Sequence, residues 1–218
     1  MNVAETPFEF FTVAYLTRIG NQSAGNLVEL LAGLEQCSDA SIFHHTYQTL
    51  SSHHFLTEGF SNDFAQWALA EQFAALDIRD YISIAALRAD LCRVLRDFIS
   101  AFPQFSRQEA LDRFYFCESL EVTMPFSLTA SNLDEFRDDV ATISHASFHF
   151  HFVTSRLRLQ FRTNDFSNWL AGSLGLDSLA ETINHIDIYT NTLDSARAKM
   201  LRLVDRERRK HEHDANPS

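Results

Sequence analysis

The sequence predicts an all-α protein made of two degenerate tandem copies of a multi-helix unit, packed about a pseudo-twofold axis. Hydrophobic residues make up 45% of the 218 residues, which is enough for a real core. Glycine and proline are scarce, with 6 and 4 residues. A sandwich or barrel of many short strands needs turn residues at regular intervals, so this scarcity favours helices. The third observation is an internal repeat.

Residues 24–41 align with residues 130–147 at an offset of 106 without a gap, and seven of the aligned pairs are identical. The same offset places His45 on His151. After a shortening of four residues, Asn62-Asp63-Phe64-x-x-Trp67 aligns with Asn164-Asp165-Phe166-x-x-Trp169. We therefore expect a first helical repeat over residues 1–102 and a second over residues 106–218, packed together as one globular unit.

The first repeat is expected to be a run of helices. An opening helix begins at Thr6-Pro7 and ends near Gly20, because proline is favoured in the first helical turn and glycine just after the last. The apolar residues of 84–101 recur at the 3–4 spacing of one buried helical face. Further helices are expected at 24–36, at 39–56 and from Asn62-Asp63 onward.

The second repeat is expected to open with a helix over residues 107–120. Ser106-x-x-Glu109 has the pattern of a capping box, in which each side chain accepts a backbone N–H of the other residue. The helical pattern then recurs, and we expect helices at 131–142, 145–159, 165–173, 177–186 and 193–211.

Charge and composition exclude several classes of function. The net charge of −11 disfavours binding to nucleic acid and to anionic lipid. No apolar run approaches the ~18 residues of a membrane-spanning helix, and the acidic N-terminus does not resemble a leader peptide. A cytoplasmic location is therefore expected. The three cysteines are widely spaced and are interpreted as reduced core residues, which leaves no disulfide framework and no zinc motif.

A polar stripe crosses the third helix of each repeat, which is otherwise apolar. Ser147, His151 and Ser155 are spaced i, i+4 and i+8, and therefore share one helical face. Arg156 and Arg158 follow on the same helix. In the first repeat the stripe is formed by Ser41, His45 and Thr49.

Two carboxylates could join these stripes. Asn62-Asp63 and Asn164-Asp165 stand where a helix begins, and one residue of each pair is expected to cap it. The other residue is then available to orient a histidine or to hold a ligand. If stripe and cap converge, His45 pairs with Asp63 and His151 pairs with Asp165.

Three explanations of the stripes compete. The histidines could satisfy their nitrogens within a polar core network and bind nothing. The stripes could instead line a cleft between the halves and bind a small polar or anionic molecule through His45, His151 and Arg156 or Arg158. A metal or catalytic centre would need the carboxylates as well. The sequence holds no phosphate-binding glycine loop, nucleophile elbow, CxxC or HExxH motif.

The residues also resemble a known family. The run Ser41-Ile42-Phe43-His44-His45-Thr46, followed by His53-His54-Phe55-Leu56 and the Asn62-Asp63 motif, resembles an uncharacterised bacterial family catalogued as a domain of unknown function. Phe150-His151-Phe152, Arg156-Leu157-Arg158-Leu159 and the Asn164-Asp165 motif are similar to its second half. The resemblance covers nearly the whole chain and implies no reaction. Tyr47 stands where the family pattern implies another histidine, which weakens a metal site in the first half.

The sequence thus favours a binding or regulatory module that recognises a small polar ligand or a protein partner through the seam between its halves. The ligand-binding candidates are the stripe and cap residues named above: Ser41, His45, Thr49, Asn62, Asp63, Ser147, His151, Ser155, Arg156, Arg158, Asn164 and Asp165. The alternative is a metal-binding protein or an enzyme that uses the two His/Asp pairs, with a histidine as general base. No catalytic residue, metal ligand or cofactor is assigned.

Overall fold

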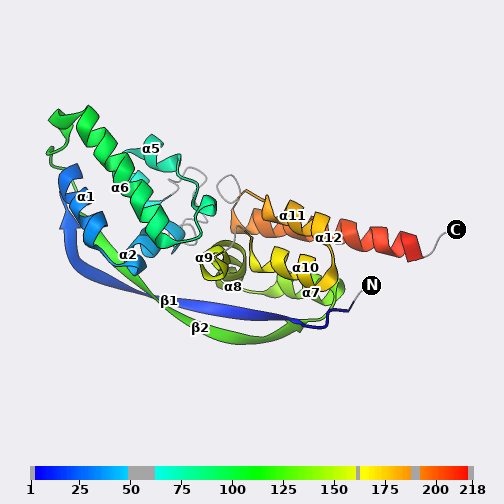
Figure 1. Cartoon of the computed structure of the whole chain (residues 1–218). Coiled ribbons are helices and arrows are strands. Elements are labelled where there is room, and N and C mark those ends of the chain that lie inside the picture. The colour runs from blue at the N-terminus through cyan, green and yellow to red at the C-terminus, as the bar shows by residue number, and fades with distance from the viewer. Residues whose placement is uncertain (1–2, 49–61, 161–162, 188–191, 216–218) are drawn as a thin grey trace. The chain divides into compact units, whose positions relative to one another are not determined.

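The computed structural model describes residues 3–48, 62–160, 163–187 and 192–215 (Figure 1). Its contacts divide the chain into two compact units. Unit 1 consists of Met1–Ala14 and Thr123–Ser218, and unit 2 consists of Tyr15–Val122. The segment Met1–Ala14 therefore belongs with the C-terminal half of the chain and not with the residues that follow it.

The predicted all-α fold is wrong, because two long strands pair with one another. β1 (Phe8–Ala24) and β2 (Phe114–Ala130) form a two-stranded sheet. Next to the strands, the Ala4 N–H donates to the Ser131 carbonyl and the Ala110 N–H donates to the Gly25 carbonyl. Both pairs of residue numbers have the same sum, so the two segments run antiparallel.

The helices expected at 6–20 and 107–120 fall on these strands. Aromatic and β-branched residues are frequent in both strands, and such side chains suit a pleated, half-buried backbone. Each strand begins with a buried, exposed, buried alternation, at Phe8–Phe10 and at Phe114–Phe116. Two long strands separated by a block of helices need few turns, so scarce glycine and proline do not exclude them.

The capping box expected at Ser106 and Glu109 starts no helix. The Ser106 hydroxyl donates to the Pro103 carbonyl at 2.8 Å. The Glu109 carboxylate accepts a hydrogen bond from the side-chain amide of Asn26 at 3.0 Å. Both side chains are used by neighbouring turns and caps, and the chain enters β2 at Phe114.

Unit 2 holds the helices of the first half of the chain. Their bounds are α1 (Leu27–Gln36), α2 (Asp39–Phe43), the π-helical η1 (His44–Gln48), α4 (Asp63–Trp67), α5 (Ala70–Ala74), the 3-10 turns η2 (Ile78–Asp80) and η3 (Pro103–Phe105), and α6 (Ile84–Ala101). The helix expected over 84–101 is confirmed with those bounds, and only 39–48 of the helix expected over 39–56 lies within the described residues. α6 packs along α1 and α2 (Figure 1) and buries Leu87, Leu91 and Leu95.

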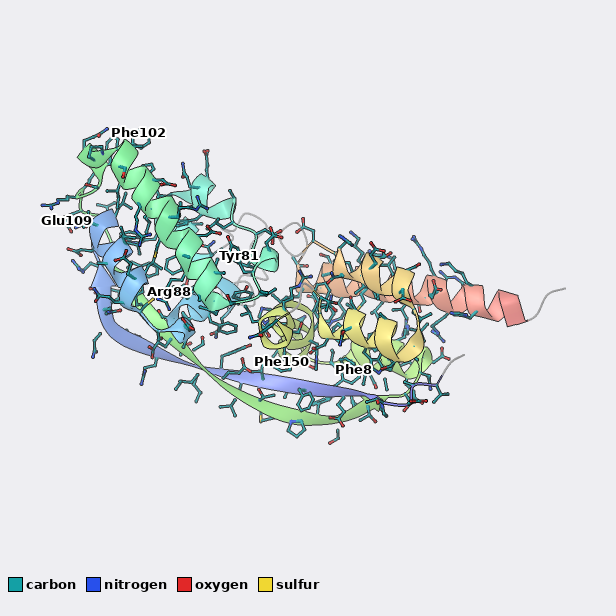
Figure 2. The ribbon with its side chains drawn as sticks, viewed as in Figure 1. Phe8, Tyr81, Arg88, Phe102, Glu109 and Phe150 are labelled. Carbon is teal, nitrogen blue, oxygen red and sulfur yellow. The ribbon has the colours of Figure 1, made fainter. Side chains whose placement is uncertain are left out.

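Arg88 joins three elements of unit 2. It lies on α6 beside α1 and α2 (Figure 2). Its Nη1 donates to the carbonyls of Leu34 and Cys37 at 2.6 and 2.7 Å, and its Nη2 pairs with Asp39 at 2.7 Å. The guanidinium thereby satisfies carbonyls at the end of α1 that have no partner within the helix.

Unit 1 holds the helices of the second half. Their bounds are α7 (Leu133–Thr142), α8 (His145–His149), the π-helical η4 (Phe150–Thr154), α9 (Ser155–Leu159), α10 (Asp165–Leu174), α11 (Asp177–Asn184) and α12 (Leu193–Ala215). α10 packs on α11, and α12 packs on α7 and α11 (Figure 1). The helices predicted at 131, 145, 165, 177 and 193 begin at or close to those positions, and Asn132, Ser144 and Asn164 cap three of them.

The core of each unit is aromatic, and a strand supplies two of its rings. In unit 1, Phe8 of β1 lies against Phe136 and Phe166 with ring centroids 5.8 and 5.4 Å apart (Figure 2). In unit 2, Phe114 of β2 lies against Phe64 at 5.2 Å. Phe8 and Phe114 correspond to one another at the offset of the sequence repeat. The helices of unit 1 therefore pack on the start of β1, although β1 comes just before the helices of unit 2 in the sequence. The helices of unit 2 pack on the start of β2, which comes just before the helices of unit 1.

Within the described residues, no helix is both long enough and apolar enough to cross a bilayer. The cysteines are free thiols, with Cys37 and Cys92 buried and Cys117 half-buried.

Candidate functional site

The stripe of unit 1 holds the backbone of β1. The Phe11 N–H donates to Nε2 of His151 at 2.9 Å, and the Ser147 hydroxyl donates to the Phe11 carbonyl at 2.6 Å. The two side chains therefore satisfy both backbone polar groups of one strand residue. Ser155 is turned to its own helix, where its hydroxyl donates to the His151 carbonyl at 2.7 Å.

The predicted pairing of His151 with Asp165 is present in unit 1. Nδ1 of His151 lies 2.7 Å from Oδ2 of Asp165. Asn164 is the helix cap, since its side-chain oxygen accepts the Ser167 N–H at 2.9 Å. The cap and the histidine partner are thus neighbouring residues with separate tasks, as the Asn-Asp motif predicts.

Unit 2 repeats this arrangement with the strand β2. The Cys117 N–H donates to Nε2 of His45 at 2.9 Å, and Nδ1 of His45 lies 2.7 Å from Oδ2 of Asp63. Asn62 caps α4 through the Ala65 N–H at 2.8 Å. His45 and His151 are both almost fully buried, at 4% and 2% exposure, in π-helical turns at corresponding positions of the repeat.

These contacts assign a tautomer to both histidines. Nε2 accepts a backbone N–H, so it carries the lone pair, and Nδ1 carries the proton that it donates to the carboxylate. A general base needs a lone pair that faces a substrate. In His45 and His151 that lone pair is already used by a strand, so the geometry favours the structural explanation of the two pairs over the catalytic one.

The hydroxyl of Ser41 breaks the equivalence of the two stripes. Its Oγ is buried and has no oxygen or nitrogen hydrogen-bond partner in the described part of the chain. It interacts only weakly with the thiol of Cys37, whereas its repeat counterpart Ser147 bonds to the strand. Ser41 lines a cavity of about 560 Å³ in unit 2. The cavity is bounded by residues of β1, α1, α2 and β2: Arg18, Ile19, Gly20, Asn21, Gln22, Gln36, Cys37, Ser38, Ser41, Phe116 and Glu118.

The thiol of Cys37 lies in the same cavity wall as Ser41. Burial raises the pKa of this thiol, so it stays protonated at neutral pH. A neutral thiol is a weak donor and a weak acceptor, and it does not satisfy a neighbouring hydroxyl as an oxygen or nitrogen atom would.

An ion pair lies at the rim of this cavity. Arg18 is paired with Glu118, and Ser38 donates its hydroxyl to the other carboxylate oxygen of Glu118 at 2.6 Å. The hydrogen bonds from Ser38 and Arg18 lower the pKa of the Glu118 carboxyl below its usual range. The carboxylate therefore stays ionised and balanced by the guanidinium, and the cavity wall has no net charge from this pair.

A second difference between the units lies beside His45. His44, His45 and Cys117 each offer a ligand atom, and these atoms lie within 4.8 Å of one another. Unit 1 has Phe150 and Phe11 at the positions that correspond to His44 and Cys117, and both rings pack against His151. Burial and the neighbouring His45 lower the pKa of His44.

The remaining candidates from the sequence are dispersed. Arg156 donates to the backbone carbonyl and side-chain oxygen of Asn184 at 3.2 and 3.0 Å. Arg158 lies in α9, but its side chain is outside the described residues, as is the whole of Thr49. Arg156 is not among the residues that line the cavity.

Sequence reasoning missed Arg18, Glu118 and Cys117. Arg18 and Glu118 meet only because two distant strands pair, and the opening segments were expected to be helices. A signal for Cys117 was available, because the repeat offset of 106 aligns Phe11 with Cys117 and His44 with Phe150. In both comparisons unit 2 has a residue that can bind metal, His44 or Cys117, where unit 1 has phenylalanine. Both of these residues lie beside His45.

Comparison with known proteins identifies a solved structure and a family. The chain is similar to the structure of OrfY from Thermoproteus tenax, with a TM-score of 0.77 and 28% identity over 94% of this chain and 97% of that chain. No curated protein matches it. Residues 5–205 match a group of sequences described as "Family of unknown function (DUF5752)". The chain therefore belongs to DUF5752, a family whose description assigns no function.

Proposed function

We propose that the protein is a binding module that takes a small, uncharged polar ligand in the cavity of unit 2. The observation that carries this proposal is the hydroxyl of Ser41, which is buried in a residue of the cavity wall and has no oxygen or nitrogen partner among the described residues, only the weakly bonding thiol of Cys37. Leaving a buried hydroxyl without a hydrogen bond costs about 1–3 kcal/mol. A ligand that supplied the missing bond would recover that free energy.

The charges at the cavity support an uncharged ligand. Arg18 and Glu118 neutralise one another, so the pair gives the cavity no net charge to attract an ionic ligand. The other polar groups at the cavity are mainly hydroxyls and side-chain amides, which come from Ser38, Ser41, Asn21, Gln22 and Gln36. Such groups both donate and accept hydrogen bonds. A ligand that carries amide or hydroxyl groups matches this set.

The His/Asp pairs support binding over catalysis. Both nitrogens of His45 are engaged, Nε2 by the Cys117 N–H and Nδ1 by Asp63. His151 is engaged in the same way by Phe11 and Asp165. We assign these four side chains the task of fixing the strands that border the helices, and we assign ligand contact to Ser41.

Three small probes of nearly equal shape test the proposal: propionamide, propionate and propylammonium. We expect propionamide to shift the backbone amide signals of Ser38 and Ser41 in ¹⁵N-edited NMR spectra, with saturation in the millimolar range. Propionate and propylammonium are expected to shift them much less at equal concentration, since each carries a charge for which the neutral Arg18–Glu118 pair offers no net attraction.

Ser41→Ala and Ser147→Ala form a matched pair for this experiment. Ser41→Ala should weaken the response to propionamide at least several-fold, and Ser147→Ala should leave it unchanged. Equal responses of the two variants, or stronger binding of propionate than of propionamide, would contradict the proposal.

We also infer that the two halves of the sequence arose by duplication. The His–Asp pairs, their Asn caps and the strand amides that bond the histidines recur at the offsets of the sequence repeat, which supports this origin. A bacterial origin, a cytoplasmic location and a protein partner stay predictions from the sequence.

A further inference from the structure

We propose that unit 2 contains a zinc site whose ligands are Cys117, His44 and His45. This site is separate from the proposed ligand cavity, and its test does not depend on that cavity. The three side chains come from β2 and η1, and their candidate ligand atoms lie within 4.8 Å of one another. Among the described residues this is the cluster whose ligand types and spacing suit a thiophilic metal ion.

The chemistry of the three side chains selects the ion. Thiolate and imidazole together suit Zn²⁺, whereas carboxylate and carbonyl oxygens suit Mg²⁺ and Ca²⁺. Tetrahedral Zn²⁺ with bonds of about 2.0–2.3 Å separates its ligand atoms by about 3.3–3.7 Å. The candidate ligand atoms lie within 4.8 Å of one another, so zinc binding requires any pair of them to approach by no more than about 1.5 Å. Three protein ligands leave a fourth position for water.

Both histidines are oriented as metal-binding histidines usually are. Nδ1 of His44 lies 2.8 Å from the Ser119 hydroxyl and 3.2 Å from the Gln48 side-chain oxygen. That amide oxygen can only accept, so Nδ1 of His44 is the donor and Nε2 carries the lone pair. Nδ1 of His45 is held by Asp63 at 2.7 Å. Hydrogen bonds from the outer nitrogen fix the ring of a metal ligand and raise its basicity.

Unit 1 shows what the same framework looks like without metal-binding side chains. There Phe150 and Phe11 pack on His151 with centroids 5.0 and 6.2 Å from it. Unit 2 keeps the buried histidine, its carboxylate and its strand amide, and has His44 and Cys117 in place of both phenylalanines. If positions 44 and 117 served only to fill an apolar core, phenylalanine would suit them as it does in unit 1.

Zinc binding changes two bonds in a defined way. The Cys117 thiol loses its proton to solvent as the sulfur–zinc bond forms. His45 can give Nε2 to zinc only when the Cys117 N–H releases it. Zinc is therefore expected to expose the Cys117 amide, while the Phe11 amide, held by His151 in unit 1, is unaffected.

The experiment uses the full chain freed of metal by chelation, then titrated with Co²⁺ and Zn²⁺. Co²⁺ reports a cysteine ligand by a sulfur-to-cobalt absorption band, which surface histidines cannot produce. We expect one equivalent of Co²⁺ to generate the band and one equivalent of Zn²⁺ to remove it. Hydrogen exchange of the Cys117 amide should become faster with Zn²⁺.

His44→Phe combined with Cys117→Phe copies the side chains of unit 1 and is the matched control. This variant should keep the helical circular dichroism signal, give no cobalt band and lose the zinc-dependent exchange at residue 117. Should it fold poorly, Cys117→Ser removes the sulfur with little change of volume and is expected to abolish the band. Asp63→Asn should weaken Zn²⁺ binding by about 10–100-fold, the usual effect of losing the group that orients a ligand.

The absence of a cobalt band in the wild-type chain would overturn the proposal, as would a band that persists in Cys117→Ser. Ser41→Ala should bind Zn²⁺ like the wild type, so the zinc site and the ligand cavity can fail independently.

Discussion

Ser41 and Ser147 occupy corresponding turns of their two units, but within the described residues only the hydroxyl of Ser147 donates to an oxygen acceptor. Ser147 donates to the Phe11 carbonyl at 2.6 Å, whereas Oγ of Ser41 is buried and makes no such bond. The same residue type thus completes a contact with a strand in one unit and belongs to a cavity wall in the other. The stripe of unit 1 is therefore structural, and the stripe of unit 2 contains the candidate ligand-binding residue.

Ser41→Ala and Ser147→Ala should differ in their effect on the free energy of unfolding. Ser147→Ala loses one hydrogen bond to the strand and should lower the free energy of unfolding by about 1 kcal/mol. Ser41→Ala removes an unsatisfied buried hydroxyl and should leave that free energy unchanged or raise it. Urea denaturation checks this, with Trp67 reporting on unit 2 and Trp169 on unit 1, because the chain has two tryptophans. Equal losses for the two variants would contradict the prediction.

His151→Phe should destabilise unit 1 by about 2–4 kcal/mol, since it leaves both the Phe11 N–H and the Asp165 carboxylate without their histidine. His45→Phe should cost less in unit 2, because the Asp63 side chain is 26% exposed and that of Asp165 only 11%. After the substitution, water can hydrogen-bond the Asp63 carboxylate more readily than the Asp165 carboxylate. Denaturation followed through single-tryptophan variants gives both values, and a tolerated His151→Phe would mean that the histidine is not needed to hold β1.

Arg88→Met and Arg197→Met should change the free energy of unfolding by different amounts. Ser83 and Thr192 each cap a first turn, and the two arginines lie at the same distance after these caps. Arg88 donates to the Leu34 and Cys37 carbonyls, so its loss should cost about 2 kcal/mol.

Arg197 has buried Nε and Nη2 atoms without hydrogen-bond partners in the described ranges, and it packs on the Phe148 ring at 5.1 Å. Burial lowers the pKa of its guanidinium, so the folded state holds this charge at a cost. Arg197→Met should therefore be neutral or stabilising. A loss as large as that of Arg88→Met would indicate a partner for Arg197. Thermal unfolding of both variants at one pH provides the comparison.

The pair of Arg137 and Asp205 should stabilise unit 1 in a pH-dependent way. Arg137 lies 3.0 Å from the Asp205 carboxylate, and its hydrogen bond lowers the pKa of that carboxyl below its usual range. A lowered pKa stabilises the fold above the ordinary pKa, and this stabilisation disappears as the pH falls through the lowered one. Both side chains are about a third exposed, so Arg137→Met should cost about 0.5 kcal/mol at pH 7 and less at pH 2, where more of the carboxyl is protonated. Denaturation at both pH values checks this, with Asp205→Asn as the control.

Several helix starts were predicted correctly from local signals, although the capping-box pattern at Ser106 starts no helix. Asn26, Asn62, Asn132 and Asn164 all cap helices, and the neighbouring aspartates of the second and fourth were correctly expected to meet His45 and His151. A cap acts over about three residues, so its effect can be seen in a short stretch of sequence. The pairing of each histidine with an aspartate could be expected because the histidine stripe and the Asn-Asp motif both occur in each half of the sequence.

Contacts between distant strands could not be predicted in the same way. Phe11 and Cys117 bond to histidines 140 and 72 residues away, and nothing in the spacing near either residue indicates these partners. The segments around them were expected to be helices, which removed the strand amides from consideration as partners of Nε2. The cavity was missed for the same reason, since Arg18 and Glu118 lie on opposite strands.

The division of the chain into units also sets an order of events at the ribosome. Unit 2 is one continuous stretch, Tyr15–Val122, and can fold once its last residue has emerged. The segment Met1–Ala14 is made before unit 2 but belongs with helices that are made after it. Phe8 and Phe10 therefore wait, uncovered, for α7 and α10 to be synthesised. We therefore expect the nascent chain to carry an uncovered apolar segment throughout that interval, the kind of segment that chaperones of emerging chains shield.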